Sequence, residues 1–346
     1  MARSTKNKQT LRSTPEVRQL NRERIRRAIQ QRETFTKAEV SRWTSLSVST
    51  CNTILNEMLA DGETLHVSQE DSYVGRPASR YRYNPDHLHA LVVNVTAEGG
   101  RPTISLAVAN AVGEILRRGE RQLDEITCST IEAFIADQLS TDRLISGIAL
   151  GIPGITLDGV IERCDVQSLV GIDIEERLRE KFGLAIEVGN DMLFIATGVY
   201  HTVPHQGGDH ATLLFPRDNC VGCGFVIDGK PLRGHSKSAG ELFYIAEGFG
   251  VTQASQMDAL DDPAAFRELA ARMVLITAGT IDPEFVMLMG NGVNDADLVA
   301  IRERCEPILS TRHMPRLLAD NNVADFYVSG LVRVILDQLQ FQLVPR

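Results

Sequence analysis

Residues 36–62 read TKAEVSRWTSLSVSTCNTILNEMLADG, and this stretch decides the first part of the fold. Thr36 and Glu39 have the spacing of a capping box, which predicts a short helix after Thr36. Ser47 is a favourable N-cap for a second helix, which Asp61-Gly62 ends. The apolar side chains of that second helix recur along one face, so this face is expected to be buried. They are Cys51, Ile54, Leu55, Met58 and Leu59.

The flanking sequence completes a small domain. Thr14-Pro15 predicts the start of a preceding helix, and Leu65–Gln69 and Ala78–Tyr83 predict two strands. Three helices and a two-stranded ribbon form a winged helix-turn-helix, which is therefore predicted for residues 14–86. Residues 1–13 are expected to be a disordered basic tail.

The outward face of the helix after Ser47 carries short, mostly uncharged polar side chains that suit base edges and phosphates in a DNA major groove. The candidate DNA-binding residues on it are Ser47, Val48, Ser49, Thr50, Asn52, Thr53 and Asn56. Asn52 and Asn56 are candidates to pair with adenine, and Ser47 and Thr50 to hold a phosphate. Three-helix units of this kind also mediate protein contacts, which is the alternative.

The predicted wing carries Gly75-Arg76-Pro77. The proline favours an extended conformation at Arg76, which could then enter a narrow minor groove. A simple turn at the end of the wing explains the same three residues equally well.

Charge is distributed unevenly along the chain. Residues 1–88 carry 15 Lys or Arg against 10 Asp or Glu, and the remainder carries 21 against 35, which gives the net charge of −9. An acidic protein with a basic head suggests that a polyanion, here double-stranded DNA, contacts the head alone. A solvated basic tail is the alternative.

Cysteine usage and hydropathy predict a cytoplasmic protein without disulfides and without a membrane partner. The six cysteines are scattered, no signal peptide is evident, and no apolar run approaches the roughly 18 residues of a membrane span. Cys220-Val-Gly-Cys223 has CxxC spacing but no second pair, so no metal site is predicted there and both thiols are expected to pack as small apolar groups.

Strands and helices alternate from Ala90 onward, which predicts an α/β domain with a mixed sheet over residues 87–346. The alternation partly returns later, which favours two similar α/β halves. Towards the end of the chain, Ala324–Val328 is predicted as a strand and Leu331–Leu343 as the final helix.

Polar residues lie where such sheets bind ligands. Asn190-Asp191 follows an apolar strand and opens a helix, at the carboxyl edge of the predicted sheet. Together with Pro153, Gly154 and Glu241 it forms a candidate site for a polyhydroxylated ligand, because carboxylates accept hydrogen bonds from vicinal hydroxyls. Asp191 could equally only cap its helix, and Glu241 could equally be solvated.

In this order the motifs resemble the ROK family of repressors, open reading frames and kinases, and its repressor branch in particular. The resemblance is carried by the head and by Gly147–Gly154, Val188–Asp191, Gly222–Lys230 and Ala239–Glu241. It implies a two-lobed, actin-like and ribonuclease-H-like sugar-kinase fold after the head. It also implies that Asn190, Asp191 and Glu241 bind a sugar.

The departures from the family pattern bear on function. Kinase members begin this domain with Asp-x-Gly-Gly-Thr, and Asn94 stands where that aspartate would be. Phosphoryl transfer depends on the carboxylate as a magnesium-side anchor. Tyr244 takes the place of the family's histidine, and the family's zinc cysteines do not follow it. No catalytic residue, cofactor or metal is therefore predicted.

The sequence as a whole predicts a DNA-binding transcriptional regulator, a repressor of carbohydrate-metabolism genes. We expect a homodimer or tetramer on a pseudo-palindromic operator, controlled by a sugar or sugar derivative bound in the larger domain. Two alternatives stay open: a sugar kinase with a DNA-binding head, and a regulator sequestered by a protein partner.

Overall fold

The computed structural model describes residues 14–67, 79–96, 102–157, 159–216, 220–248 and 252–342. These residues fall into two compact units. The first unit holds the residues up to Leu88, together with Asn110–Val112 and the residues from Asp337 on, and the second holds the rest. None of the described helices is long and apolar enough to span a membrane.

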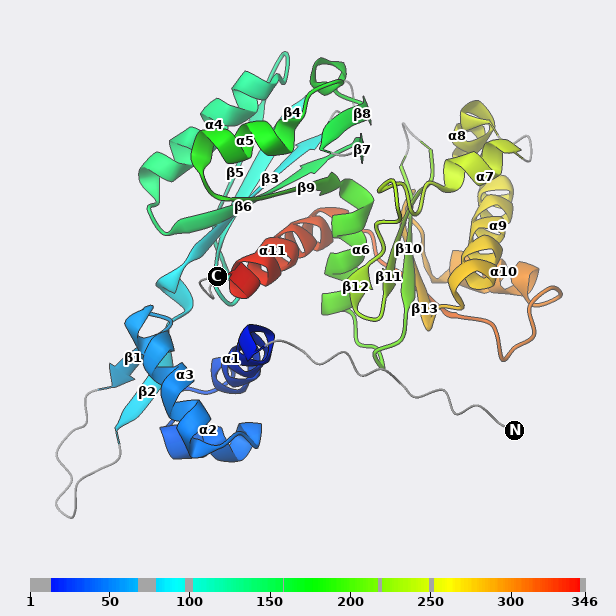
Figure 1. The fold of residues 1–346 in the computed structure, drawn as a ribbon. Helices are drawn as coiled ribbons and strands as arrows, with labels where there is room; N and C mark the ends of the chain where they lie inside the picture. The colour runs from blue at the N-terminus through cyan, green and yellow to red at the C-terminus, as the bar shows by residue number, and fades with distance from the viewer. Residues whose placement is uncertain are drawn as a thin grey trace, which may run out of the picture. The chain divides into compact units, whose positions relative to one another are not determined.

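The first unit begins with three helices and a two-stranded antiparallel sheet (Figure 1). The elements are α1 (Thr14–Gln30), α2 (Lys37–Thr44), α3 (Val48–Ala60), β1 (Thr64–Val67), β2 (Arg80–Tyr83) and the 3-10 helix Pro85–His87. The predicted capping box is present, since the Thr36 hydroxyl accepts from Glu39 N and the Glu39 carboxylate accepts from Thr36 N. The core is made of buried side chains from all three helices: Ile25, Ile29, Val40, Cys51, Ile54, Leu55 and Met58.

A buried ion cluster ties α1 to the start of β1. Arg22 lies 2.8 Å from the Glu63 carboxylate, and Arg26 pairs with the other oxygen of the same group. The three residues are 5%, 1% and 0% exposed. Burial acts to raise the pKa of Glu63, but the two guanidinium groups outweigh it and lower that pKa below its usual value. The cluster therefore holds a charged carboxylate inside the head.

The second unit contains two five-stranded mixed sheets whose strands are ordered alike. The orders are β5-β4-β3-β6-β9 and β12-β11-β10-β13-β14. In each sheet the central strand pairs in parallel with the next, and that strand pairs in parallel with the edge strand. The returning alternation of the sequence thus corresponds to two sheets of one topology.

The strands of the first sheet are β3 (His89–Thr96), β4 (Thr103–Asn110), β5 (Ile115–Gln122), β6 (Ile145–Ile152) and β9 (Ala185–Asn190). Those of the second are β10 (His210–Phe215), β11 (Gly222–Ile227), β12 (Lys230–Pro231), β13 (Phe285–Gly290) and β14 (Arg316–Ala319). A separate hairpin consists of β7 (Gly154–Leu157) and β8 (Val160–Cys164).

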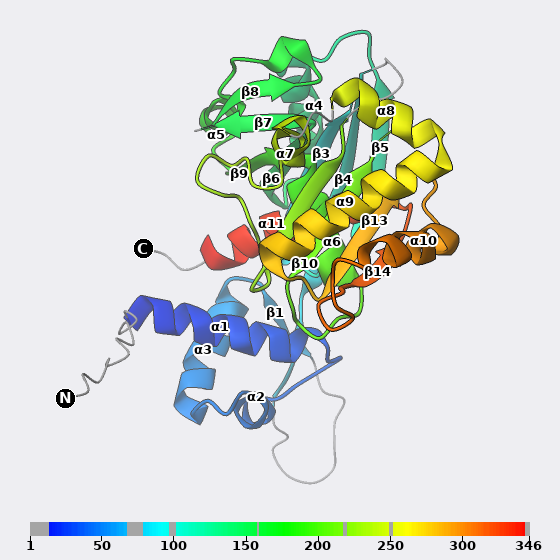
Figure 2. The ribbon, with the colours of Figure 1, turned by 90° about the vertical axis from the view of Figure 1, so that its right-hand side faces the viewer.

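The helices of this unit cover the sheets. They are α4 (Cys128–Thr141), α5 (Ile174–Phe182), α6 (Asp191–Thr202), α7 (Leu242–Gly248), α8 (Gln253–Asp261), α9 (Pro263–Ile281), α10 (Asp295–Cys305) and α11 (Val323–Gln342), with a 3-10 turn at Gln167–Leu169. The residues of α11 from Asp337 on belong to the first unit. Side chains of α4 and α5 share one core with the first sheet, and those of α9 and α10 share another with the second. Figure 2 shows the ribbon of these helices and sheets from a second side.

Helix α6 links the two sheets, because it contacts β9 and β6 of one sheet and β11 and β10 of the other. Helix α11 crosses α6 at very short range. A Cβ on Gly198 would lie 1.9 Å from Phe326 O, and one on Gly330 would lie 1.7 Å from Phe194 O. These two glycines permit the crossing, since no larger residue fits there.

The predicted strand at Ala324–Val328 is wrong, because these residues belong to α11. Their aromatic and β-branched side chains favour a strand locally. In the fold, however, the buried residues of this segment continue a helical period through Phe326, Tyr327, Leu331 and Ile335. Packing of this stripe against α6 and the first sheet outweighs the local preference.

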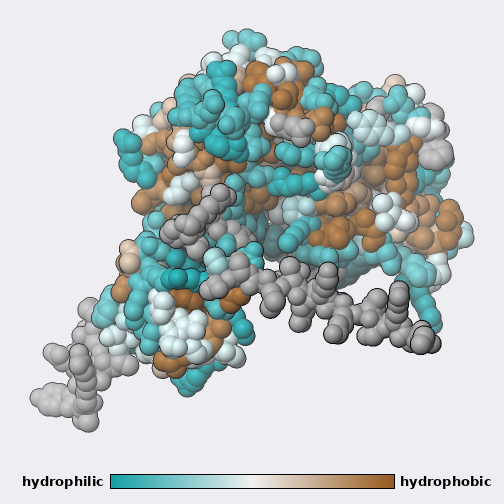
Figure 3. Space-filling view, in the orientation of Figure 1, coloured by the Kyte–Doolittle hydropathy of each residue, from teal (hydrophilic) through white to brown (hydrophobic). Residues whose placement is uncertain are grey.

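Figure 3 shows hydrophilic residues over most of the face that it draws, with apolar residues gathered on the right, where Figure 1 places α9 and α10. Val299 of α10 is 58% exposed and Ile308, just after that helix, is 71% exposed. Apolar side chains are therefore exposed at and just after α10, as well as buried in the core beneath it.

Candidate functional site

The outward face of α3 presents the polar side chains that the sequence assigned to it. Ser47, Val48, Ser49, Thr53 and Asn56 are exposed, while Thr50 and Asn52 are half-buried. The Ser47 hydroxyl caps the helix by accepting from Thr50 N at 3.1 Å, and it also bonds the hydroxyls of Ser49 and Thr50. The hydroxyl of Thr53 donates to Ser49 O. The first turn of α3 is therefore a compact, uncharged, exposed patch of hydroxyl groups.

One residue of this face contacts the neighbouring helix. Lys37, the first residue of α2, donates to the side-chain oxygen of Asn56. Its ammonium group also lies 5.4 Å from the ring centroid of Tyr81. No motif pointed to Lys37, because the contact joins residues 19 positions apart.

The positive charge of the head is only partly available to a nucleic acid. Arg22 and Arg26 are buried and paired with Glu63, so the charge count of the sequence overstates the surface charge. Arg24 and Arg42 are exposed. Arg76, predicted to enter a minor groove, lies outside the described residues.

A pocket in the second unit is built from elements of both sheets. It is lined by Thr156, Val188, Gly189, Asn190, Leu193, Cys223, Gly224, Phe225, Leu232, Arg233, Lys237, Ala239 and Glu241. Asn190 and Glu241, far apart in sequence, thus meet in one cavity. Pro153, Gly154 and Asp191 are not among the lining residues.

Asn190 fixes the corner where β9 becomes α6. Its side-chain oxygen accepts from Met192 N at 2.7 Å, and its amide nitrogen donates to Gly154 O at 3.0 Å. Asp191 also accepts from Met192 N, at 2.8 Å, so it contributes to the cap. Gly154 acts through its backbone, because a Cβ there would lie 2.1 Å from Arg163 O. Gly154 and Asp191 thus contact residues at the pocket edge without lining the cavity themselves.

Glu241 approaches the pocket because the preceding glycine permits it. Gly240 has a φ of +97°, and a Cβ on it would lie 2.2 Å from Cys223 O. Close packing of this loop on β11 leaves Glu241 partly buried. Burial raises the pKa of Glu241, and the positive charge of Arg163 only partly opposes this effect.

Two cations of the pocket, Arg233 and Lys237, were not expected from the sequence. Arg233 pairs with Glu187 of β9 at 2.6 Å and so joins the segment after β12 to the first sheet. Lys237 has a φ of +57° in the loop before Glu241. Neither residue belongs to a recognisable motif, and only the polar loop between Leu232 and Glu241 hinted at them. The pocket therefore combines a carboxyl group, an amide and two cations.

Asn94, which the resemblance to the ROK family places where kinase members carry aspartate, lies near the pocket lining. Asn94 of β3 pairs with Gly151 of β6, which pairs with Gly189 of the pocket. The Tyr327 hydroxyl packs directly on Gly151, where a Cβ would lie 2.1 Å from it. Burial, with Asp191 as a smaller cause, raises the pKa of Tyr327 well above its usual value. The displaced glycines at residues 99–100 lie outside the described residues.

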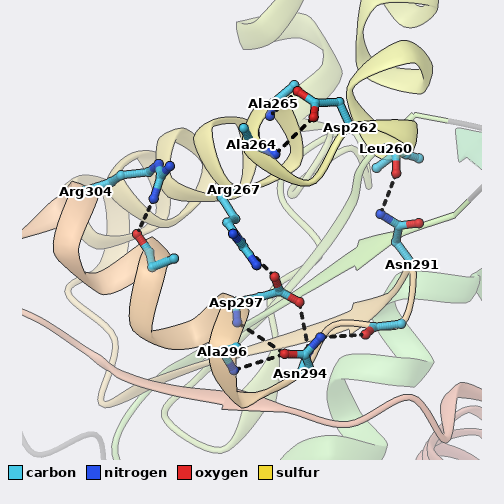
Figure 4. A network of polar contacts seen from close by, with 12 residues as sticks. Leu260, Asp262, Ala264, Ala265, Arg267, Asn291, Asn294, Ala296, Asp297 and Arg304 are labelled. Carbon is cyan, nitrogen blue, oxygen red and sulfur yellow. Dashed lines mark hydrogen bonds and ion pairs between the residues drawn. The ribbon is translucent and has the colours of Figure 1, made fainter.

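The later glycine turn, Gly290-Asn291-Gly292, has three successive positive φ angles, of 81°, 47° and 67°. Figure 4 shows how it is held. The Asn291 amide donates to Leu260 O, and Asn294 and Asp297 form a capping box that opens α10. Arg267 of α9 pairs with Asp297 at 2.9 Å. The turn is thus anchored on both sides by polar contacts.

The CxxC pair behaves as packed thiols in this fold. Cys223 is buried within β11 and Cys220 is half-buried. Burial raises the pKa of both thiols, which disfavours the thiolate that a metal or a redox reaction requires. Within the described ranges, no group of three His, Cys, Asp or Glu side chains is placed to hold a metal ion.

Comparison with known proteins shows which family and which relatives this chain resembles. Residues 95–248 match the model of the ROK family. The chain contains a ROK family domain. A putative xylose repressor from Caldicellulosiruptor sp. (strain Rt8B.4) is 22% identical over 284 residues, which cover 78% of this chain and 70% of the relative. The xylose repressor of Caldicellulosiruptor bescii is 20% identical with the same coverage.

Solved structures extend the likeness of the ROK domain to nearly the whole chain. A ROK family transcriptional regulator, described as a homologue of the E. coli MLC protein, matches with a TM-score of 0.71 at 15% identity and covers 94% of this chain and 98% of its own. A ROK hexokinase from Thermus thermophilus matches with a TM-score of 0.56 at 18% identity, over 73% of this chain and 99% of its own. The α/β fold is therefore shared with both regulators and sugar kinases.

Proposed function

We propose that this protein is a sugar-responsive transcriptional repressor. Residues 14–86 are its winged helix-turn-helix, and residues 87–346 bind the ligand and another copy of the chain. The observation that carries the proposal is the outward face of α3, which is exposed and polar in a chain that also contains a ROK domain. The xylose repressors among its relatives support the assignment.

The DNA-binding role rests on the geometry of the head. Helix α3 buries Cys51, Ile54 and Met58, and its opposite face leaves Asn52 and Asn56 available to base edges. The hydroxyl groups around Ser47 lie at a helix N-terminus, where a phosphate is favoured by free backbone N–H groups. Arg76 in the wing is proposed as a minor-groove contact.

The ligand role rests on the pocket. Glu241 and Asn190 supply an acceptor and an amide in one cavity, which suits a ligand with several hydroxyl groups. Pro153, Gly154 and Asp191 are proposed to support the site from behind. Their contacts with Asp165, Asn190 and Met192 fit that role.

Asn94 favours a regulatory role over an enzymatic one. Asn94 offers an amide where kinase relatives have the carboxylate that anchors magnesium. The ligand would then act by favouring one conformation of a dimer or tetramer on a palindromic operator. A coupling of roughly 1–3 kcal/mol between ligand and DNA is sufficient for regulation. The cytoplasm is the compartment in which such a repressor acts.

The test uses the full-length protein with a library of duplex fragments from its own genome at low salt. We expect selective retention of fragments and a change in their affinity with one of a panel of sugars and sugar derivatives. Asn52→Asp, which places a negative charge on the outward face of α3, should weaken binding at least about tenfold. Gln31→Glu makes the same charge change outside α3 and should have little effect.

The same preparation is assayed for sugar-dependent ATP consumption. Turnover with any sugar, combined with no retention of DNA, would reject the proposal in favour of a kinase.

A further inference from the structure

Lys37 is held in a defined place beside the outward face of α3. Its backbone lies in the first turn of α2, where the capping box of Thr36 and Glu39 fixes the helix start. Its ammonium group is attracted to the ring of Tyr81, which is 8% exposed and stacks with Phe35. From there it donates to Asn56. The lysine is thus positioned by α2 and β2 and directed at α3.

This contact fixes the orientation of the Asn56 amide. An ammonium group has three donors and no acceptor, so only the oxygen of the amide can face it. The amide nitrogen of Asn56, with its two N–H donors, is left pointing away from Lys37. Because Asn56 is exposed, those donors are available to a partner outside the chain. Lys37 therefore occupies one of the two lone pairs of the Asn56 oxygen and places a positive charge beside it, which disfavours the approach of a further hydrogen-bond donor.

The contact with Lys37 affects which base Asn56 can recognise in the major groove. Asparagine recognises adenine by accepting from N6 and donating to N7 at once, and the first of these bonds would bring the electropositive N6 amino group next to the ammonium group on the same oxygen. Guanine presents two acceptors, O6 and N7, in the major groove. Both the Asn56 amide and the Lys37 ammonium group can donate to them, whereas the N6 amino group of adenine would oppose the lysine.

We propose that Lys37 and Asn56 together read guanine at one operator position, with Lys37 as the residue that determines specificity. The inference rests on the proposed DNA-binding function and names what one part of that surface recognises. It replaces the pairing of Asn56 with adenine that the sequence indicated.

The experiment is a binding-site selection from a randomised duplex library with the full-length protein, followed by titration of the selected duplex and its single-base variants. The wild type should select guanine at one position of the site. Lys37→Met keeps an unbranched side chain at this position but removes the ammonium group that contacts Tyr81 and the Asn56 oxygen. It should lower the preference for guanine over adenine at that position about tenfold.

Three further variants separate specificity from general charge. Lys37→Arg retains donors and charge and should keep the guanine preference. Asn56→Ala should reduce discrimination at the same position and at no other. Arg42→Met removes an exposed cation from the same helix and should weaken all sequences alike, with base preference unchanged.

Selection of adenine by the wild type would overturn the inference and leave the proposed function standing. So would a Lys37→Met variant that weakens every duplex equally, because Lys37 would then be a phosphate contact. A wild-type protein that retains no duplex would overturn both.

Discussion

The two units of this protein use buried polar groups in opposite ways. In the head, Arg22, Arg26 and Glu63 form an internal cluster in which opposite charges meet, and the face proposed to bind DNA carries uncharged side chains. In the second unit the buried His210 stays neutral, and Glu241, Arg233 and Lys237 line the pocket. Charges paired inside the head hold its fold, whereas the pocket is bordered by a carboxyl group and two cations, of which Arg233 also pairs with Glu187. Four predictions test this contrast.

The largest effect is expected for Glu63→Gln, which removes the buried carboxylate shared by Arg22 and Arg26 and leaves Arg22 paired with Asp61 alone. Removing one partner of a buried ion cluster costs about 3–5 kcal/mol, so the head should unfold at much lower urea concentration. Trp43 is the only tryptophan of the chain and lies in α2, so its fluorescence follows the head alone. Glu23→Gln, which breaks the more exposed pair with Arg27, should change stability by less than about 0.5 kcal/mol. Equal effects of the two variants would contradict the structural role of the cluster.

The second-largest effect is expected for the pH dependence of the stability of the second unit. Burial lowers the pKa of His210 to about 3, so the folded state takes up its proton only in strong acid while the unfolded chain does so near 6.5. At pH values above the pKa of His210 in the unfolded chain, this group does not lower the free energy of unfolding. As the pH falls from that value towards the pKa of His210 in the folded protein, the free energy of unfolding decreases. The free energy of unfolding should fall by about 1.4 kcal/mol per pH unit over this range, or about 2 kcal/mol at pH 5.

Circular dichroism during urea unfolding at several pH values measures this dependence. His210→Phe keeps a ring between Tyr200 and Phe285 and removes the titrating group, so its slope between pH 6.5 and pH 5 should be smaller than that of the wild type. A slope that is the same in the two proteins would refute the assignment.

A third comparison concerns the N-caps of α3 and α6. Ser47→Ala and Asn190→Ala each remove one cap, at about 1 kcal/mol, and the second also removes the bond to Gly154. We expect Ser47→Ala to weaken DNA binding without altering ligand binding, and Asn190→Ala to do the reverse. A ligand-induced thermal shift and a DNA titration on the same preparations separate the two. Loss of both functions in either variant would show that the change is not local.

The smallest effect on stability, with the opposite sign, is expected for Glu241→Gln. Because burial raises the pKa of Glu241 in the folded protein, its ionisation opposes folding as the pH rises above the unfolded-state pKa. The neutral variant should therefore unfold at slightly higher temperature at pH 7, and this advantage should vanish as the pH falls below the pKa of Glu241 in the unfolded chain. The same variant should lose the thermal shift caused by an active sugar. A variant that keeps its full response to the ligand would remove Glu241 from the site.

Local physics let the sequence predict much of the head and the order of strands and helices. The capping box at Thr36, the cap at Ser47 and the buried face of α3 depend on residues within one or two helical turns. The same holds for Asn190 at the start of α6. Such features are visible in the chain itself, because the interacting groups are neighbours along it.

Only the tertiary structure decided the contacts between distant residues. It brought Lys37 to Asn56, Arg22 to Glu63 and Arg233 to Glu187, and it placed Ala324–Val328 in a helix rather than a strand. It also separated Asp191 from the pocket lining and brought Asn190 and Glu241 together there. A side chain's partner over such distances depends on how whole elements pack, and residue type and spacing alone do not carry that information.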